Sequence, residues 1–260
     1  MSRIKIITVV VNFQMFNRFF RDNPHLRSCD VVCIDNRTRN RGLPAVYNEV
    51  IEESLGSDRW LFFVHEDFEI KSDLNIVMGL SRDVVYGTFG VKLSGNVPFG
   101  VGRHVVSNKD GSRPSIVGVE VSSPVSVQTL DCQSILVHAS LFADRPKLRF
   151  DENLTFDLYA EDFGLNAVEN FNIDLQVFPL DVQHYSYGNI TERYVAGLEY
   201  LARKYPTVAV PGSCSFIGGR AHELEEHFQY QIPADPRYRS RFARASARVK
   251  SWIASAIRKV

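Results

Sequence analysis

Trp60-Leu-Phe-Phe-Val-His-Glu-Asp67 is the most informative segment of the chain. Its first five residues are apolar, which is typical of a strand that is buried on both faces of a sheet. The run stops at two carboxylates, Glu66 and Asp67. Open α/β sheets bind ligands at the carboxyl ends of their strands, and Mg²⁺ or Mn²⁺ is usually held by one or two carboxylates together with substrate phosphates. The segment therefore predicts either a ligand site or two acids that simply leave the core and meet solvent.

The residues before this segment predict an α/β order. Ile4–Val11 and Asp30–Asp35 are apolar, β-branched runs that indicate two further strands, and a helix is expected from about residue 43 to Leu55 after the Gly/Pro-containing entry at residues 40–48. Strands that alternate with helices favour a parallel sheet with right-handed crossovers. Asp35 and Asp67 then lie at the same edge of the sheet, although they are far apart in the sequence.

The middle of the chain is more irregular. Residues 74–80 predict a helix, and residues 86–93 and 125–130 predict two strands. Between them, residues 94–124 are rich in Gly, Ser and Pro, and an insertion of this kind often faces a substrate. Its Gly-Val-Gly at residues 100–102 lacks the third glycine and the helix of a dinucleotide-binding motif.

A second acidic pair, Glu161-Asp162, falls within a predicted helix that starts near Asp157 as its N-cap. The apolar stripe of this helix is expected to contain Leu158, Leu165 and Val168, so at least one of the two acids borders a buried face. Partial burial raises the pKa of a carboxyl group, which suits a general base. Acids in the first turn of an ordinary amphipathic helix give the same pattern.

Composition narrows the class of protein. The 260 residues have zero net charge, which gives no signal for nucleic-acid binding, and the apolar fraction is that of a globular protein. The four cysteines have no zinc-site spacing and predict reduced thiols in a cytoplasmic setting. We expect no signal peptide and no membrane-spanning helix. Two matches to the glycosylation sequon, at Asn153 and Asn189, are interpreted as chance.

Over residues 4–188 the chain resembles the family 2 type of nucleotide-sugar glycosyltransferases with the GT-A fold, in the bacterial branch that has Phe-Val-His-x-Asp where others have Asp-x-Asp. The resemblance implies a Rossmann-like, mostly parallel central sheet flanked by helices, a nucleotide-sugar donor and a Mn²⁺ or Mg²⁺ ion. It implies metal ligands at Asp67, His65 and His184, and catalysis by Asp162, the usual base, with Glu161 beside it. It implies donor-binding positions at Asp35, Asn36, Gly42, Asn48, Glu66 and Asp131.

The implied reaction moves a sugar from a nucleotide diphosphate to a hydroxyl of a glycan or of a lipid-linked glycan. Asp67 and the diphosphate share the metal, Asp162 takes the proton of the acceptor hydroxyl, and the anomeric centre is inverted. Two departures from the family pattern are that His65 replaces the first Asp of the metal motif and that Tyr47 stands where an Arg is common. The chain also lacks the Gln-x-x-Arg-Trp of processive polysaccharide synthases, so we expect a non-processive enzyme.

Two other functions stay open at this stage. A sugar nucleotidyltransferase is disfavoured because no glycine-rich, basic loop follows the first strand. A non-catalytic GT-A-like module that binds a glycan or a partner protein is favoured by the missing first Asp of the metal motif.

The end of the chain is expected to form a helical extension, residues 191–260, after a catalytic domain at residues 1–190. Eight Lys and Arg residues and no acids follow Pro236, which leaves the rest of the chain acidic. Within residues 237–260, apolar residues recur at spacings of three and four, including Trp252 and Ile253. A basic amphipathic helix of this kind predicts binding to an anionic membrane surface, here the inner face. The same stripe could instead contact the catalytic domain or a second copy of the chain in a homo-oligomer.

Overall fold

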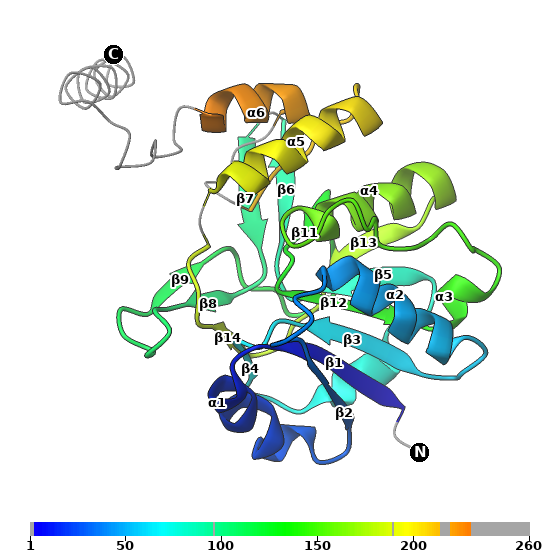
Figure 1. The fold of residues 1–260 in the computed structure, drawn as a ribbon, viewed down its shortest axis with the longest axis vertical. Coiled ribbons are helices and arrows are strands. Elements are labelled where there is room, and N and C mark those ends of the chain that lie inside the picture. The colour runs from blue at the N-terminus through cyan, green and yellow to red at the C-terminus, as the bar shows by residue number, and fades with distance from the viewer. Residues whose placement is uncertain (1–2, 96, 189, 214–218, 230–260) are drawn as a thin grey trace.

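A central sheet with helices on both faces forms the body of the protein (Figure 1). The computed structural model describes residues 3–95, 97–188, 190–213 and 219–229. The sheet has seven strands in the order β10-β13-β5-β12-β3-β1-β2. These strands are β1 (Ile4–Val10), β2 (Asp30–Asp35), β3 (Trp60–Val64), β5 (Val84–Gly87), β10 (Val125–Ser126), β12 (Ser134–His138) and β13 (Asp174–Val177). The α/β class predicted from the sequence is confirmed.

Two smaller sheets and a set of helices complete the described structure. One small sheet has the order β11-β6-β7 and the other β4-β14-β8-β9. Their strands are β4 (Phe68–Ile70), β6 (Gly90–Ser94), β7 (Val97–Val101), β8 (His104–Val106), β9 (Ser115–Val117), β11 (Thr129–Leu130) and β14 (Val182–His184). The α-helices are α1 (Phe13–Phe16), α2 (Leu43–Ser54), α3 (Ser140–Ala143), α4 (Tyr159–Phe171), α5 (Glu192–Lys204) and α6 (Ala221–Gln229). A π-helical turn η1 (Asn17–Arg21) and the 3₁₀ turns η2 (Pro24–Leu26) and η3 (Leu74–Gly79) accompany them.

The first three strands of the sheet are parallel, as predicted: β1 lies between β2 and β3 and pairs with both in the same direction. β12 is antiparallel to both of its neighbours, β3 and β5. β13 is parallel to β5, and the edge strand β10 is antiparallel to β13. The sheet is therefore mostly parallel with two reversed strands.

The reversal of β12 follows from where the chain enters the sheet. The backbone N–H of His65, just after β3, donates to the carbonyl oxygen of Gln133 at 3.1 Å. The residue before β12 thus already lies at the carboxyl end of β3, and the only way to extend the sheet from there is to run back. The apolar sequence of this strand does not determine its direction.

The apolar run of β3 fills two cores at once. Leu61 and Phe63 point to the core on the side of α2 and α4, whereas Trp60, Phe62 and Val64 point to the core on the side of α1 and η1. All five side chains are buried. A strand with a helical layer on each face needs apolar residues at every position, which explains the unbroken run.

Two strands predicted as single segments are each divided between sheets. Residues 86–93 form the end of β5 and most of β6, and residues 125–130 form β10 and β11. Glycine permits the first break, because a Cβ atom at Gly90 would lie 2.5 Å from the carbonyl oxygen of Thr129. At residues 74–80 the predicted helix is the 3₁₀ turn η3.

The helix expected to start at Asp157 starts instead at Tyr159. Leu158 precedes it in the left-handed conformation, with φ 61°. The Asp157 carboxylate does not cap the helix but accepts from Arg193 Nε of α5 at 2.6 Å. Both Glu161 and Asp162 are buried, whereas Val168, which the sequence placed with the apolar stripe, is 38% exposed.

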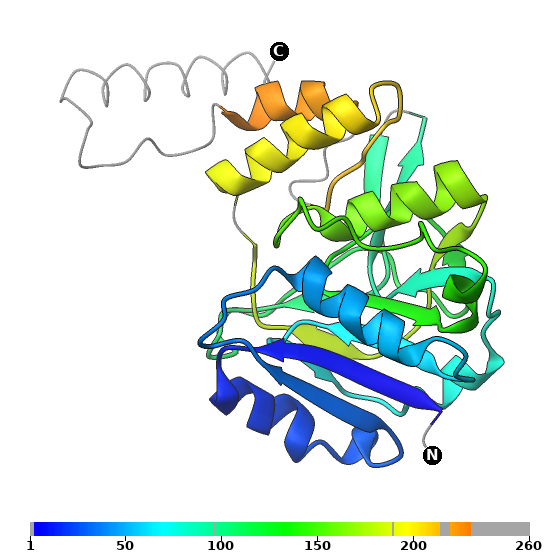
Figure 2. The ribbon, with the colours of Figure 1, turned by 45° about the vertical axis from the view of Figure 1, so that its right-hand side comes forward.

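Helices α5 and α6 lie side by side next to α4 (Figures 1 and 2). Tyr194, Leu198 and Leu201 of α5 are buried in the same core as α4. Their spacings of four and three residues in the sequence predict one buried side of a helix. The basic tail, residues 237–260, lies outside the described residues. None of the helices described has the length and apolar character needed to cross a membrane.

Candidate functional site

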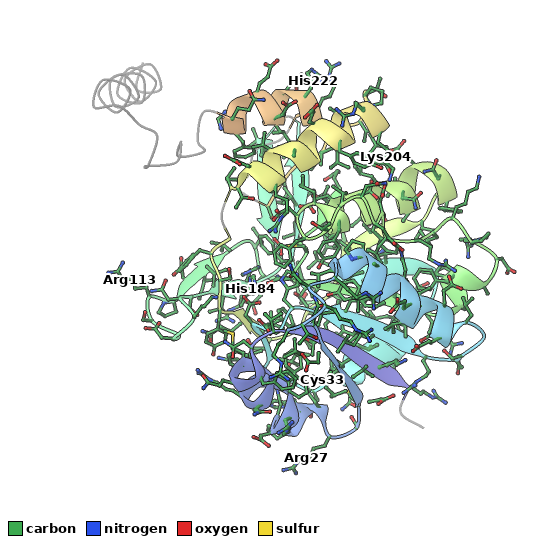
Figure 3. All side chains as sticks on the ribbon, viewed as in Figure 1. Arg27, Cys33, Arg113, His184, Lys204 and His222 are labelled. Atoms are coloured by element: carbon green, nitrogen blue, oxygen red, sulfur yellow. The ribbon has the colours of Figure 1, made fainter. Side chains whose placement is uncertain are left out.

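His65, Asp67 and His184, the three residues that the sequence assigns to metal binding, lie in one cluster. One potential ligand atom from each residue lies within 4.8 Å of those of the other two. The cluster forms because β14 pairs with β4, and His184 is opposite Phe68 in that pair. The backbone N–H of Tyr185 also donates to the carbonyl oxygen of Asp67 at 2.9 Å. Figure 3 shows His184 near the middle of the molecule, where β14 meets the central sheet.

Asp67 and His184 control each other's charge in this cluster. Burial lowers the pKa of His65, so its imidazole is neutral at pH 7. Burial opposes the charge of Asp67, but the neighbouring His184 outweighs it and holds the pKa of Asp67 well below its usual value. Burial likewise works to lower the pKa of His184, and Asp67 reverses this and raises it. His184 Nε2 lies 3.2 Å from Asp67 Oδ1, at an ion-pair distance but without hydrogen-bond geometry.

Tyr159 fixes the ring of His65. Its hydroxyl donates to the carbonyl oxygen of Cys132 at 2.6 Å and lies 3.0 Å from His65 Nε2. The single hydroxyl proton is used at Cys132, so the hydroxyl accepts from Nε2–H of His65. The remaining ring nitrogen, Nδ1, then carries a lone pair. A partner that fixes the tautomer in this way is typical of histidines that bind metals.

Glu66, one of the predicted donor-binding residues, joins two strand ends. Its Oε2 accepts from the backbone N–H groups of Val11 and Asn12 at 2.8 and 2.7 Å. The carboxylate therefore holds the end of β1 against the end of β3. The structure gives it a positioning role beside the cluster.

Asp35 and Asn36 lie at the carboxyl end of β2, at the same edge of the sheet. The Asp35 carboxylate is exposed and pairs with Arg37 at 2.7 Å, and hydrogen bonds from Arg37 lower its pKa. The Arg37 guanidinium in turn lies over the ring of Phe13, 4.4 Å from its centroid. Asn36 is buried, and its amide exchanges hydrogen bonds of 2.9 Å with the backbone of Arg41.

Gly42 and Asn48 connect α2 to the segment that precedes α4. Gly42 is the N-cap of α2, and a Cβ atom there would lie 3.2 Å from the Cα atom of Thr155. The Asn48 side chain accepts from the backbone N–H of Phe150 at 3.0 Å and donates to its carbonyl oxygen at 2.9 Å. Both residues therefore position the loop that leads into α4.

Asp131 is half-buried in the turn before β12. Its Oδ1 accepts from the backbone N–H of Gln133 at 3.0 Å. Burial would raise its pKa, but His104, Ser213 and His184 lower it below the usual value. The sequence pointed to Asp131 and not to His104, which belongs to the irregular insertion.

The two acids of α4 have different surroundings. The Glu161 side chain is buried, and its Oε2 has no hydrogen-bond partner among the described residues. Burial, reinforced by the charge of Asp131, raises the pKa of Glu161 to about 8. A carboxyl group with this pKa can take up a proton near neutral pH, as a general base must.

Asp162 is tied to the C-terminal helix α5. Lys204 Nζ lies 2.7 and 3.0 Å from its two carboxylate oxygens and 2.6 Å from Asp151 Oδ2. Burial opposes the charge of Lys204, but the two acids raise its pKa well above the usual value. Figure 3 places Lys204 between α5 and α4. Lysine in the last turn of a helix is readable from sequence, but its partner 42 residues away is not.

Comparisons with known proteins give a limited result. No protein-family model and no curated protein matches the sequence. Among solved structures, the chain is similar to the crystal structure of GalNAc-T7 with UDP, GalNAc and Mn²⁺, at 11% identity and a TM-score of 0.46. The match covers 88% of this chain and 54% of that chain, so this chain spans about half the length of that protein. What the site described above can do depends on its own residues.

Proposed function

We propose that this protein is a metal-dependent glycosyltransferase of the family 2 type that uses a nucleotide-sugar donor. The observation that carries the proposal is the cluster of His65, Asp67 and His184 at the carboxyl end of β3. The buried Glu161, with its raised pKa, starts the neighbouring helix α4. Asp131 is near enough to raise the pKa of both Glu161 and His184, so the proposed base and the cluster lie on either side of it.

The side chains of the cluster fit a divalent cation. His184 Nε2 is buried without a hydrogen-bond partner among the described residues, and Asp67 supplies the charge. Two imidazoles and one carboxylate suit Mn²⁺ better than Mg²⁺, which prefers an all-oxygen shell. Such an ion, when bound, would neutralise charge on the departing nucleotide diphosphate. The chain's own part is to hold Asp67 ionised, His65 neutral and both imidazoles oriented.

Glu161 is the better candidate for the base in this chain, although the family pattern assigns that role to Asp162. Both oxygens of Asp162 contact Lys204, so accepting a proton there would disrupt the ion pair that compensates the buried Asp162 carboxylate. Glu161 Oε2 has no hydrogen-bond partner in the part of the chain that the structure describes, and burial raises the pKa of this carboxyl group to about 8. In the proposed reaction Glu161 Oε2 takes the proton of the acceptor hydroxyl, whose oxygen forms the new bond to the anomeric carbon as the bond to the diphosphate breaks. A single displacement of this kind inverts the anomeric centre.

The proposal extends to the acceptor, the position of the donor and the location of the enzyme. The acceptor is a hydroxyl of a glycan or of a lipid-linked glycan, and transfer is non-processive. The donor's nucleotide lies along Asp35, Asn36, Gly42 and Asn48. The basic tail holds the enzyme at the inner face of a membrane, and the division into residues 1–190 and 191–260 remains a prediction.

The experiment that tests this function is a thermal-shift screen with UDP, GDP, CDP and dTDP and their common sugar conjugates, each with and without Mn²⁺. Hydrolysis of the nucleotide sugar that gives the largest shift is then measured. We expect a Mn²⁺-dependent shift and turnover in the wild type, nearly complete loss in Asp67→Ala, and no change in Asp144→Asn, an exposed acid on another part of the surface. Wild-type protein that binds and turns over no nucleotide sugar with Mn²⁺ would refute the proposal and favour the non-catalytic module.

A further inference from the structure

His104 and Gln133 form a buried polar pair that neither the metal cluster nor the base explains. Gln133 Nε2 lies 2.9 Å from His104 Nδ1 and 3.5 Å from Thr88 Oγ1. Gln133 is fully buried, and His104 is 5% exposed. The pair joins β8, in the irregular insertion, to the turn before β12.

Each member of the pair keeps one unsatisfied polar atom. His104 Nε2 and Gln133 Oε1 are both buried and lack a hydrogen-bond partner among the described residues. Leaving a buried polar atom unpaired costs roughly 1–3 kcal/mol, so two such atoms in one hydrogen-bonded pair require an explanation. A ligand that supplies the missing partners is a sufficient one.

The hydrogen-bonding chemistry of the pair selects the ligand. With the amide nitrogen of Gln133 at His104 Nδ1, the histidine proton is on Nε2, which is an unused donor, and Gln133 Oε1 is an unused acceptor. Turning the amide over exchanges the two roles and again leaves one donor and one acceptor. A phosphate oxygen accepts only and a cation bonds to acceptors only. A hydroxyl group both donates and accepts, and so satisfies the pair in either arrangement.

The position of the pair indicates which hydroxyl this is. The His104 ring lies against the ring of His184, with centroids 5.6 Å apart. Asp131, which forms a hydrogen bond to the backbone of Gln133, is close enough to act on the pKa of His104. A hydroxyl group bound by His104 and Gln133 therefore lies next to the proposed metal cluster on one side and next to the Asp131 carboxylate on the other. That carboxylate disfavours a phosphate there and favours a neutral, hydroxyl-bearing group attached to the diphosphate.

We propose that His104 and Gln133 form a subsite that binds a hydroxyl group of the donor sugar. This subsite rests on the proposed function, since it requires a nucleotide sugar held at His65, Asp67 and His184. Both unsatisfied atoms are closed to solvent in this conformation, so binding requires side-chain rotamer changes of the kind that commonly accompany complex formation. The subsite gives the insertion at residues 94–124 a defined part in sugar selection.

The test compares affinities for a nucleotide sugar and for the same diphosphate without the sugar. The nucleotide sugar is the one that gives the largest shift in the thermal-shift screen, and both ligands are titrated calorimetrically with Mn²⁺. His104→Phe keeps a ring but removes both nitrogens, and His104→Gln keeps an amide donor and acceptor. His138→Phe is the matched control, because His138 is a buried histidine at the opposite end of β3, paired with Trp60.

We expect His104→Phe to bind the diphosphate as the wild type does and to bind the nucleotide sugar on the order of 10-fold more weakly, with partial recovery in His104→Gln. Among the monodeoxy forms of the donor sugar, one should bind the wild type more weakly and show no further loss with His104→Phe. The control should bind both ligands as the wild type does.

Three results would overturn the subsite. Equal losses for diphosphate and nucleotide sugar would mean that His104 only supports His184. Unchanged affinity for both ligands would mean that the pair is structural. Equal sensitivity of the wild type and His104→Phe to every deoxy form would mean that the pair binds a water molecule rather than the sugar. A wild type that binds no nucleotide sugar refutes the proposed function itself, whereas a wild type that binds one without the expected His104 effect refutes only the subsite.

Discussion

At the scale of single residues, the two acids of α4 show how neighbouring carboxylates acquire different properties. Asp162 meets Lys204, and Glu161 meets no cation among the described residues. Burial acts on both, but only Asp162 has a compensating charge in contact with it. The difference arises from α5 and is invisible in the local sequence.

The pH dependence of transfer should report Glu161. Because a base must be ionised, kcat/KM should rise with pH through an apparent pKa of about 8, the value that burial gives this group. Glu161→Gln should lower turnover by roughly two to four orders of magnitude and abolish this rise of kcat/KM with pH. The affinity for the donor should be retained. A larger loss of turnover in Asp162→Asn than in Glu161→Gln would show that Asp162 is the general base.

Glu161 should also affect stability. Its pKa is raised in the folded chain, from 4.5 to about 8. The protonated form is thus favoured by folding, and the stability that this contributes is fully present below pH 4.5 and is lost as the pH rises through 8. Glu161→Gln, which cannot ionise, should therefore melt at increasingly higher temperature than the wild type between pH 5 and 9. A melting difference that does not change with pH would contradict the burial of the charge.

The ion pair between Lys204 and Asp162 should be a strong structural contact. Removing one partner leaves a buried charge unpaired, and Lys204→Met should cost about 3 kcal/mol of unfolding free energy. The double variant Asp162→Asn, Lys204→Met should recover most of that loss in urea denaturation. Additive effects of the two substitutions would mean that the residues do not interact in solution.

At the scale of elements, the close approach of α2 to the loop before α4 depends on Gly42. Gly42→Ala should destabilise the protein by about 1–2 kcal/mol, because the new methyl group meets the backbone of Thr155 at 3.2 to 3.3 Å. Gly79→Ala is the control, since nothing lies within 4 Å of its Cβ position. Equal midpoints of denaturation for the two variants would show that the loop at Thr155 moves aside without a loss of unfolding free energy.

Helices and strands could be predicted where the local pattern of apolar residues alone determined them. The apolar run of Trp60–Val64, the helix ending near Leu55 and the stripe of α5 all required only periodicity. The direction of β12 was not predictable, because it depends on where Gln133 already lies. The sequence pointed to Asp67 as an acid at a strand end, but it found His65 and His184 only through family resemblance. It did not find His104 and Tyr159 beside these histidines, or Lys204 beside Asp162.

At the scale of the whole molecule, the acidic body and the basic tail predict an electrostatic attraction to anionic membranes. Each Lys or Arg near an anionic leaflet contributes about 1 kcal/mol. The full chain should therefore sediment with vesicles that contain phosphatidylserine, less so at high salt, and a chain that ends at Ala234 should remain in solution. Identical sedimentation of both chains would leave the tail as a packing or oligomerisation segment.

The central claim is that His65, Asp67 and His184 hold a divalent cation, and Mn²⁺ binding tests it most directly. Free Mn²⁺ is measured by its electron paramagnetic resonance signal while protein is added in the presence of the nucleotide diphosphate selected by the thermal-shift screen. We predict that the wild type and Asp144→Asn remove about one Mn²⁺ ion per chain from the free pool, and that Asp67→Asn binds it at least about 10-fold more weakly, with a smaller loss in His65→Ala. Equal Mn²⁺ binding by the wild type and Asp67→Asn, or none by either, would contradict the claim.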